Sequence, residues 1–237
     1  GGAAPVIVTG DSDIYEVRKA LLDGCFYHAG QVSVSVQRIF AHTKIATKLA
    51  TQLAMKAAGL IAGDPMNKDT VIGPLIRPEE TDRIHEWVLE AVNGGGQLLT
   101  GGEKLSDTVY APTVIFNAPT NCRIMTEEVL GPVVCIDPWF DVEDAVQRAN
   151  SLPTAIHAAV FTRDIESAMS ISNLLDASAV MINDHTAFWT EWMPFSGLRE
   201  AGVGTTGIPY AIDELRVDKT IVLRTDSLEM PKDADPT

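Results

Sequence analysis

A serine stands at the place in the sequence that best suits covalent chemistry. The segment Gly-Gln-Val-Ser over residues 30–33 lies between a helical pattern and a strand pattern, so Ser33 falls in the connecting turn. A serine hydroxyl attacks a carbonyl only when a neighbouring base takes its proton, and His28 and His185 are the candidates for that base. This hypothesis makes the chain a hydrolase, but no Gly-x-Ser-x-Gly elbow is present and nothing fixes the geometry of a triad.

Metal and disulfide chemistry find no support in the sequence. The five histidines lack the paired spacing of a metal site. Cys25, Cys122 and Cys135 are odd in number and also lack paired spacing, which argues against a disulfide framework. We therefore expect no metal, three packed thiols in a reducing compartment, and a cytoplasmic location.

A glycine-rich segment, Gly-Val-Gly-Thr-Thr-Gly over residues 202–207, matches the spacing of a dinucleotide-binding loop. Such a loop needs an apolar strand before it and an acidic residue ~20 positions after it. Residues 194–201, Pro-Phe-Ser-Gly-Leu-Arg-Glu-Ala, precede it instead. We expect a turn whose glycines allow positive φ angles, where an added Cβ would clash and no nucleotide binds.

The charge balance disfavours polyanionic partners. The 237 residues carry 18 Lys and Arg against 32 Asp and Glu, a formal net charge of −14. The basic residues are scattered, so neither nucleic acid nor an anionic membrane surface is an expected partner. No apolar run approaches the ~20 residues that a membrane span requires.

Short apolar runs alternate with amphipathic stretches, which predicts an α/β fold with an open, largely parallel sheet flanked by helices. The first strand is expected over residues 5–8, followed by a helix that Asp11 caps and that ends near Gly30. A second strand beginning near Val34 leads into a helix capped by Thr43. The candidate serine therefore lies at the junction between the first helix and the second strand.

The same alternation continues along the rest of the chain. A helix is expected from Pro78 to the glycines at 94–96. Residues 220–223, Thr-Ile-Val-Leu, predict a last strand, and the polar residues 231–237 are expected to be disordered. The remaining expected elements are strands at 109–116, 132–136, 155–162 and 179–183 and helices at 141–151 and 165–175.

Four segments, in order, resemble motifs of the aldehyde dehydrogenase family. Residues 30–33, with Phe26 before them and Arg38 after them, resemble the family's nucleophile segment, in which the residue after Gly-Gln-x is cysteine. Three further segments follow in the same order, and the four together span most of the chain. The three are Pro-Thr-Val at 112–114, Glu-Glu-Val-Leu-Gly-Pro at 127–132 and Met-Pro-Phe-Ser-Gly-Leu-Arg-Glu-Ala-Gly-Val-Gly at 193–204.

The resemblance implies a fold of the aldehyde dehydrogenase catalytic-domain type. It divides the chain into a catalytic domain at 1–215, an oligomerisation strand at 216–226 and a polar tail at 227–237. The glycine pair at residues 1–2 is similar to the end of the family's Glu-Leu-Gly-Gly element, whose glutamate is the general base. The resemblance therefore places that base and the family's nucleotide-binding domain before residue 1, and it implies a homo-oligomer.

The resemblance also implies site residues. The family oxidises an aldehyde to a carboxylic acid through a covalent enzyme–acyl intermediate, with NAD or NADP bound mainly by the nucleotide-binding domain. Ser33 stands at the position of the family's cysteine, where its backbone N–H forms part of the oxyanion hole. Glu128 corresponds to the residue that holds the nicotinamide ribose, and Leu130 replaces an aromatic residue beside the nicotinamide. Because a serine hydroxyl stays protonated where a thiol readily ionises, Ser33 implies an inactive chain.

Apolar and aromatic side chains near this turn predict the wall of a substrate pocket. Phe188, Trp189 and Trp192 cluster in one loop, either as an aromatic rim for an apolar aldehyde or as part of a subunit interface. No arginine occurs between His185 and Met193, which disfavours phosphorylated and dicarboxylic aldehydes. The full predicted set is Phe26, Tyr27, Val32, Val34, His185, Phe188, Trp189, Trp192 and Phe195.

Two hypotheses within the family stay open beside the hydrolase. In the first, the chain is the catalytic part of an NAD(P)-dependent aldehyde dehydrogenase whose nucleophile was changed to serine. In the second, it is a pseudoenzyme or oligomerisation module in which Ser33 is natural. A Glu-Leu directly before Gly1 would favour the first, and an independent start codon would favour the second.

Overall fold

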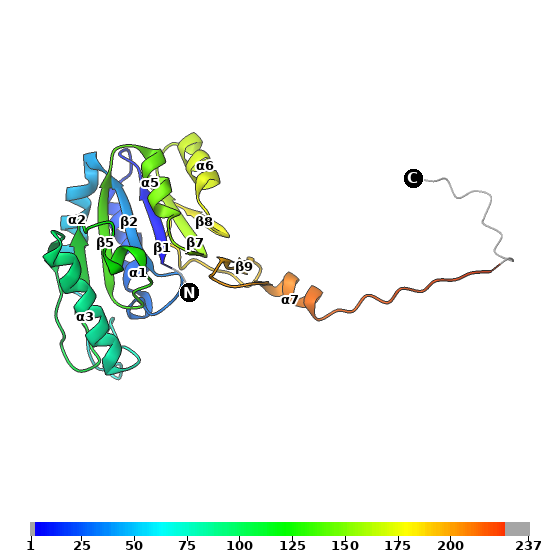
Figure 1. The fold of residues 1–237 in the computed structure, drawn as a ribbon, viewed down its shortest axis with the longest axis horizontal. Helices are drawn as coiled ribbons and strands as arrows, with labels where there is room; N and C mark the ends of the chain where they lie inside the picture. Colours follow the sequence, from blue (N-terminus) through cyan, green and yellow to red (C-terminus); the bar gives the residue numbers. More distant parts are fainter. Residues whose placement is uncertain (1–2, 226–237) are drawn as a thin grey trace.

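A seven-stranded, largely parallel sheet forms the centre of the molecule (Figure 1). The computed structural model describes residues 3–225. The strand order is β3-β4-β5-β2-β1-β7-β8, and within this sheet only β3 (Gln97–Thr100) runs antiparallel to its neighbour, β4 (Thr113–Phe116). The predicted α/β fold, an open and largely parallel sheet flanked by helices, is confirmed.

The first part of the chain builds the middle of the sheet and one helical layer. β1 (Ala4–Val8) pairs in parallel with β2 (Val36–His42), and α1 (Ile14–Phe26) connects them. α2 (Thr43–Ala57) follows β2 and packs against α1. Parallel neighbours need a long crossover of this kind, because a two-residue hairpin joins only antiparallel strands.

The later elements extend the sheet on both sides of this centre. β5 (Val133–Trp139) lies between β4 and β2. α5 (Val142–Ala149) then crosses the sheet toward β7 (His157–Phe161), which pairs with the other side of β1. α6 (Ile165–Leu174) connects β7 with the edge strand β8 (Ala179–Ile182).

Two apolar cores lie on the two faces of the sheet. Val6 and Val8 belong to the core that α1 and α2 cover, whereas Ile7 belongs to the opposite core, as the two-residue period of a strand requires. α3 (Pro78–Asn93) adds Ile84 to the second core, which also contains residues of α5 and α6. Burial on both faces is typical of parallel sheets. In residues 3–225 no helix is long and apolar enough to cross a membrane.

The cap of α1 differs from the prediction. Asp13, and not Asp11, accepts the hydrogen bond from the Tyr15 N–H that begins the helix. Asp11 lies in the preceding loop, where it accepts a hydrogen bond from the Thr9 hydroxyl and one from the Arg163 N–H at 2.9 Å. The bond from Thr9 holds the pKa of Asp11 below its usual value. Asp11 therefore fastens the end of β1 to the loop after β7.

Element boundaries near the candidate serine also differ from the prediction. α1 ends at Phe26, well before Gly30, and a short 3₁₀ turn (Tyr27–Gly30) follows. β2 begins at Val36, two residues later than expected. At the start of α2 the His42 ring accepts the capping hydrogen bond from a backbone N–H, so Thr43 is a helical residue and not the cap.

Short elements escaped the sequence analysis because they carry no periodic pattern. The strand expected at 109–116 is shortened to β4, because residues 109–111 pair with the 103–106 loop instead. Seven elements were not predicted. They are β3, α4 (Arg123–Thr126), β6 (Thr154–Ala155), β9 (Phe195–Ser196), β10 (Leu198–Arg199), β11 (Thr205–Thr206) and α7 (Ile208–Glu214).

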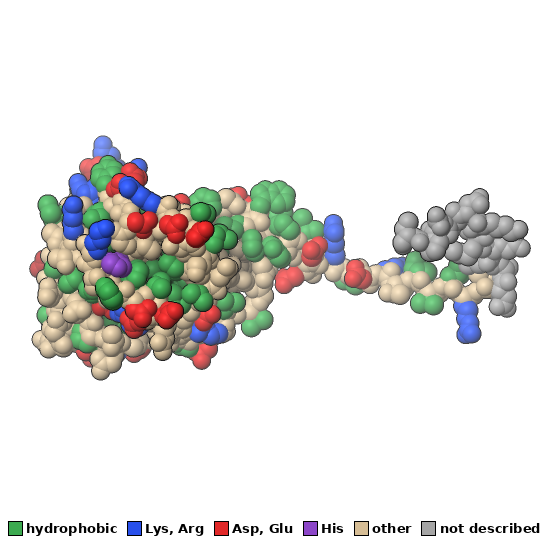
Figure 2. All heavy atoms as spheres, turned by 90° about the horizontal axis from the view of Figure 1, so that it is seen from above, with side chains coloured by type: hydrophobic (Ala, Val, Ile, Leu, Met, Phe, Trp, Pro, Cys, Tyr) green, Lys and Arg blue, Asp and Glu red, His purple; other side chains and the backbone are tan. Residues whose placement is uncertain are grey.

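The carboxy-terminal segment leaves the body of the molecule (Figure 1). α7 has no buried residue, and residues 216–225 form neither helix nor strand. Ile221, Val222 and Leu223 are 81%, 85% and 72% exposed, and Figure 2 shows hydrophobic side chains exposed along this segment. The strand predicted at 220–223 is therefore not formed in the single chain. The polar tail predicted at 227–237 lies outside the described residues.

This exposed segment predicts self-association. Exposed apolar side chains at 221–223, on a stretch that pairs with no strand in the described residues, favour pairing with another chain, and a second copy is the expected partner. In sedimentation velocity we expect oligomers or aggregates of the intact chain, and smaller species after deletion of residues 216–237. A stable monomer whose sedimentation the deletion leaves unchanged would contradict this prediction.

Candidate active site

The connection between α1 and β2 is a tight left-handed turn. Three consecutive residues have positive φ angles: His28 at 49°, Ala29 at 55° and Gly30 at 71°. This conformation costs an L side chain roughly 1–2 kcal/mol, whereas glycine adopts it freely. The turn redirects the chain from the end of α1 into the segment that carries Ser33.

Gly30 brings two motifs that are far apart in sequence into contact. A Cβ at Gly30 would lie 2.0 Å from the carbonyl oxygen of Gly131 and 2.5 Å from its carbonyl carbon. Only a hydrogen atom fits there, so the backbone at Gly30 lies directly against the Gly-Pro end of residues 127–132. Two of the segments that carry the family resemblance are thus neighbours in space.

Two glutamine side chains hold the surrounding loops to this turn. The Gln37 Nε2 donates hydrogen bonds to two carbonyls of the 124–127 segment, both at 2.7 Å, and its Oε1 accepts one from the Val129 N–H at 3.0 Å. The Gln31 amide makes one hydrogen bond to each of two backbone groups in the 74–76 loop. Gln37 is buried, and a buried amide whose donors and acceptor are satisfied in this way fixes a single loop conformation.

Ser33 lies half-buried within a hydrogen-bonded turn. The Ser35 N–H donates to the Val32 carbonyl at 3.0 Å, and the Ser35 hydroxyl donates to the Cys25 carbonyl at 3.1 Å. Within residues 3–225, neither the Ser33 side chain nor its backbone N–H has a hydrogen-bond partner. A free N–H beside a half-buried side chain can stabilise an oxyanion that forms on a bound carbonyl compound.

No base activates Ser33 among the described residues. The His28 ring packs edge-on against Tyr27, with centroids 4.3 Å apart, and the His185 Nδ1 accepts a hydrogen bond from the Ala187 N–H at 3.2 Å. The triad that a hydrolase would need is therefore not formed. The described residues also contain no group of three or more side chains that could hold a metal ion.

A hollow of about 300 Å³ opens on one side of the turn. Six of the nine predicted pocket residues line it: Tyr27, Val32, Val34, Phe188, Trp189 and Phe195. The other lining residues are His157, Thr186, Ala187 and Thr206. The lining set includes no Lys, Arg, Asp or Glu, so the hollow suits an uncharged ligand.

Three predicted pocket residues lie elsewhere. Phe26 is 2% exposed and belongs to the core beneath α1 and α2, because it is the last residue on the buried face of α1. His185 packs against α1, where a Cβ added at Gly24 would come within 2.6 Å of the His185 Cβ. Trp192 is 69% exposed and does not line the hollow.

A buried polar pair that the sequence analysis missed ties this hollow to the turn. The Thr186 hydroxyl donates a hydrogen bond to the Val34 carbonyl, and the His157 Nδ1 lies 2.8 Å from the Thr186 carbonyl oxygen. Both side chains are buried. The available signal was the histidine within an otherwise apolar strand pattern, because a buried polar side chain needs a partner.

The predicted cofactor residues lie on the other side of the turn. Leu130 has a φ of 50°, is 40% exposed and borders a narrow space together with Val32 and Gly131. Glu128 is half-buried on the same loop. Since Val32 borders both this space and the hollow, the turn stands between the predicted substrate side and the predicted cofactor side.

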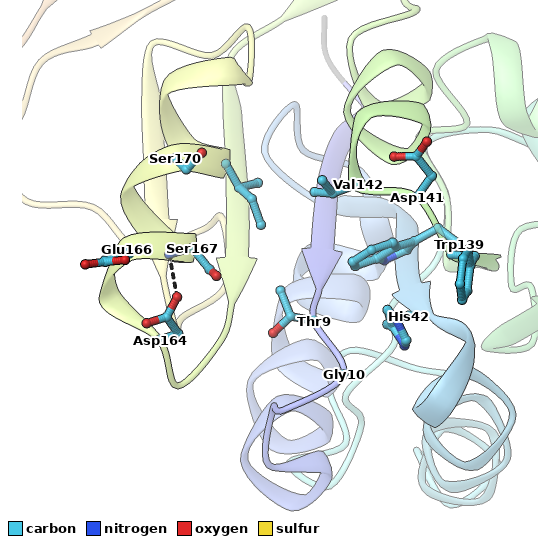
Figure 3. A pocket seen from close by; sticks show the side chains of 12 residues that line it. Thr9, Gly10, His42, Trp139, Asp141, Val142, Asp164, Glu166, Ser167 and Ser170 are labelled. Atoms are coloured by element: carbon cyan, nitrogen blue, oxygen red, sulfur yellow. Dashed lines mark hydrogen bonds between the residues drawn. The ribbon is translucent and has the colours of Figure 1, made fainter.

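A larger hollow, of about 890 Å³, lies at the opposite, carboxyl edge of the sheet (Figure 3). Thr9, His42 and Trp139 line it at the ends of β1, β2 and β5. Asp141 and Asp164 also line it, and each accepts a hydrogen bond from a backbone N–H of the helix that it caps. These two aspartates therefore have structural roles as helix caps, and none of the predicted site residues lies in this hollow.

The glycine-rich segment at 202–207 forms a connection with positive φ angles of 148°, 91° and 121° at its three glycines. No atom lies within 4 Å of a Cβ added at Gly202 or Gly204. The expected clash is found only at Gly207, where the Cβ would lie 2.7 Å from the Met193 carbonyl oxygen. Backbone conformation, and not close approach, therefore explains the first two glycines.

We expect this segment to bind no dinucleotide. Its strands are only two residues long, and it lacks the buried parallel strand that would aim its N–H groups at a pyrophosphate. Isothermal titration calorimetry of the chain with NAD and NADP checks this. Tight binding that Gly204→Ala abolishes would contradict the prediction.

Comparisons with known proteins identify the family of this chain. The chain matches the aldehyde dehydrogenase family over residues 1–221. It is 34% identical over 223 residues to the 3-sulfolactaldehyde dehydrogenase of Priestia aryabhattai, covering 94% of this chain and 46% of that protein. It is 37% identical over 223 residues to the lactaldehyde dehydrogenase of Methanococcus maripaludis, covering 94% and 48%.

A solved structure has the same fold. The glyceraldehyde-3-phosphate dehydrogenase GapN of Methanocaldococcus jannaschii, complexed with NADP, matches with a TM-score of 0.87 at 33% identity and covers 91% of this chain and 46% of that one. The chain therefore belongs to the aldehyde dehydrogenase family. It spans about half the length of the curated relatives that it matches.

Proposed function

We propose that this chain is the catalytic part of an NAD(P)-dependent aldehyde dehydrogenase, with Ser33 at the position of the nucleophile. The observation that carries the proposal is the half-buried Ser33, whose side chain and N–H have no hydrogen-bond partner within residues 3–225, directly after Val32, which borders both the hollow and the narrow space beside Leu130. In this role a nucleophile at residue 33 attacks the aldehyde carbon, and the Ser33 N–H donates to the oxygen that becomes charged.

Serine at this position silences the reaction. A thiol with a pKa near 8.5 ionises readily, whereas a hydroxyl needs a base, and none of the described residues makes a hydrogen bond to the Ser33 hydroxyl. A thioester is also more open to hydrolysis than an ester. The proposal therefore includes inactivity of the chain as it stands.

The residues on the far side of the turn fit a nicotinamide cofactor. Leu130 offers an exposed apolar side chain next to Val32, and Glu128 offers a carboxylate that can accept hydrogen bonds from ribose hydroxyls. When bound, NAD or NADP would accept a hydride from the substrate carbon. The solved relative complexed with NADP supports this assignment. Because relatives are about twice as long, we propose that most cofactor contacts come from outside these 237 residues.

The hollow supports a small, uncharged aldehyde as substrate. Its walls are aromatic and aliphatic, with Thr186 and His157 as buried polar groups. The relatives named for lactaldehyde and 3-sulfolactaldehyde support a short aldehyde. The lining residues include no Lys or Arg. We therefore propose that this chain, unlike the relative named for 3-sulfolactaldehyde, does not take an anionic aldehyde.

The test uses a polypeptide of the relatives' full length in which these residues form the carboxy-terminal part. We expect Ser33→Cys to raise NAD(P)H formation from a panel of aldehydes by orders of magnitude over the serine form. The isolated 237-residue Ser33→Cys chain should show no turnover, because the family's general base lies outside it. Equal activity of the serine and cysteine full-length forms would overturn the assignment.

A second candidate function is an assembly module of the same family. The observation that favours it is the run of exposed apolar side chains at 221–223 within the segment 216–225, which is suited to pairing with another copy in a homo-oligomer. A cytoplasmic location is part of both proposals, since Cys25, Cys122 and Cys135 are all unpaired and buried. A full-length Ser33→Cys form that oligomerises but oxidises no aldehyde would favour this second function.

A further inference from the structure

His157 lines the candidate hollow and carries a buried ring nitrogen that has no hydrogen-bond partner among the described residues. The His157 Nδ1 lies 2.8 Å from the Thr186 carbonyl oxygen, and a carbonyl only accepts, so Nδ1 carries the proton. Nε2 is then an acceptor. It is buried and has no hydrogen-bond partner among the described residues, and the side chain as a whole is only 2% exposed.

A buried hydrogen-bond acceptor without a donor lowers the stability of the fold. Leaving a buried polar atom unpaired costs about 1–3 kcal/mol, so most such atoms in native proteins find a partner. Burial also lowers the pKa of His157, which keeps the ring neutral and its Nε2 lone pair free. The ring packs edge-on against Phe195, with centroids 5.2 Å apart, and both side chains line the hollow.

The position of His157 relates it to the reacting carbon. Two consecutive hydrogen bonds, through Thr186, connect His157 to the carbonyl of Val34, the residue directly after Ser33. Ser33 itself does not line the hollow, but its two neighbours Val32 and Val34 do. A substrate carbonyl held at Ser33 therefore lies beside the hollow whose wall includes the His157 ring. Because Nε2 is buried, a ligand in the hollow reaches it only when a lining side chain shifts, and Phe195, which packs edge-on against the ring and belongs to a strand of two residues, is one of those side chains.

We propose that the His157 Nε2 accepts a hydrogen bond from a hydroxyl group on the carbon next to the aldehyde. His157 is then a specificity residue, and the substrate class is the short 2-hydroxyaldehydes. This inference rests on the proposed function, because it takes residue 33 as the point of attack.

The test needs neither cofactor nor base. In a Ser33→Cys form of the 237-residue chain, the thiol adds reversibly to an aldehyde: a C–S bond forms, the carbonyl double bond becomes a single bond, and the thiol proton passes to the oxygen. No oxidant is consumed. NMR with lactaldehyde and propanal, each ¹³C-labelled at the aldehyde carbon, measures the dissociation constant of each adduct. The quantity compared between variants is the ratio of the two constants, which cancels the different reactivities of the free aldehydes.

Two substitutions at His157 separate recognition from support of the fold. In His157→Asn the amide N–H₂ can replace Nδ1–H toward Thr186, but nothing replaces Nε2. In His157→Gln the longer side chain can place an acceptor near the Nε2 position. We expect Asn to reduce the preference for lactaldehyde by about three- to tenfold and Gln to retain most of it, which is the size of one hydrogen bond.

The outcomes are distinct. Alkylation of the introduced thiol at an unchanged rate in the Asn variant shows that the turn is intact. With an intact turn, equal aldehyde preference in the His and Asn forms overturns the role of His157 and leaves the proposed function standing. If alkylation is slower in the Asn variant but the preference for lactaldehyde over propanal is unchanged, His157 only supports the fold. That outcome also overturns its proposed role in specificity. Failure of the introduced thiol to form an adduct with either aldehyde overturns both proposals.

Discussion

A Ser33→Cys form of this chain should react with iodoacetamide about two orders of magnitude faster at the introduced thiol than at any of its native cysteines. Cys25, Cys122 and Cys135 are buried, and burial raises the pKa of each thiol, so they react only when the structure opens. Residue 33 is half-buried, and its unpaired backbone N–H stabilises a negative charge placed there. Mass spectrometry of the alkylated peptides gives the rate at each site.

Ser35→Cys is the matched control for this experiment. Ser35 lies two residues away in the same turn, but it is 7% exposed and its hydroxyl is bonded to the Cys25 carbonyl. We expect its thiol to react as slowly as the native cysteines. If the thiol of the Ser33→Cys form reacted no faster than that of the Ser35→Cys form, residue 33 would not be the exposed reactive position of the turn.

The second large effect is expected from Gly30→Ala, which should lower the free energy of unfolding by about 3 kcal/mol or more. The substitution forces a side chain into a positive φ of 71° and places its Cβ 2.0 Å from the Gly131 carbonyl oxygen. A backbone atom cannot rotate away, so either the turn or the 127–131 loop must shift. Urea unfolding followed by circular dichroism measures the loss.

Gly73→Ala is the control, because no atom lies within 4 Å of a Cβ at Gly73 and its φ is not positive. We expect a change within about 0.5 kcal/mol there. The Gly30→Ala, Ser33→Cys double variant should also lose rapid alkylation, since the turn no longer holds its geometry. Equal stability of the two alanine variants would show that the Gly30 contact is not a constraint.

The sequence predicted the sheet and its long helices correctly, because apolar residues recur in these elements with the period of a strand or a helix. It placed Ser33 at the junction after α1 for the same reason. The ends of the elements depend on local contacts that the hydrophobic period does not predict. Asp13 caps α1 in place of Asp11, and the His42 ring caps α2 in place of Thr43. The run of positive φ angles at 28–30 is equally invisible, since His28 and Ala29 adopt it under tertiary constraint.

The candidate site was only partly predictable. Apolar character identified Tyr27, Val32 and Val34, which do line the hollow, but it could not distinguish them from Phe26, whose helical position turns it into the core. His157 was overlooked because its strand and the 186–195 loop meet only in the folded chain. His185 and Trp192 belong to the same stretch of sequence as Phe188 and Trp189, but neither of them lines the hollow.

The contact between Gly30 and Gly131 also limits the order in which these positions can change over evolutionary time. A Cβ at Gly131 would lie 2.2 Å from the Cδ1 of Ile84, the end of a flexible side chain, so a smaller residue at 84 could make room for alanine at 131. No side-chain replacement can do the same at Gly30, where the opposing atoms are backbone. Descendants of this sequence can therefore drift at 131 after a permissive change at 84, whereas position 30 has no such route.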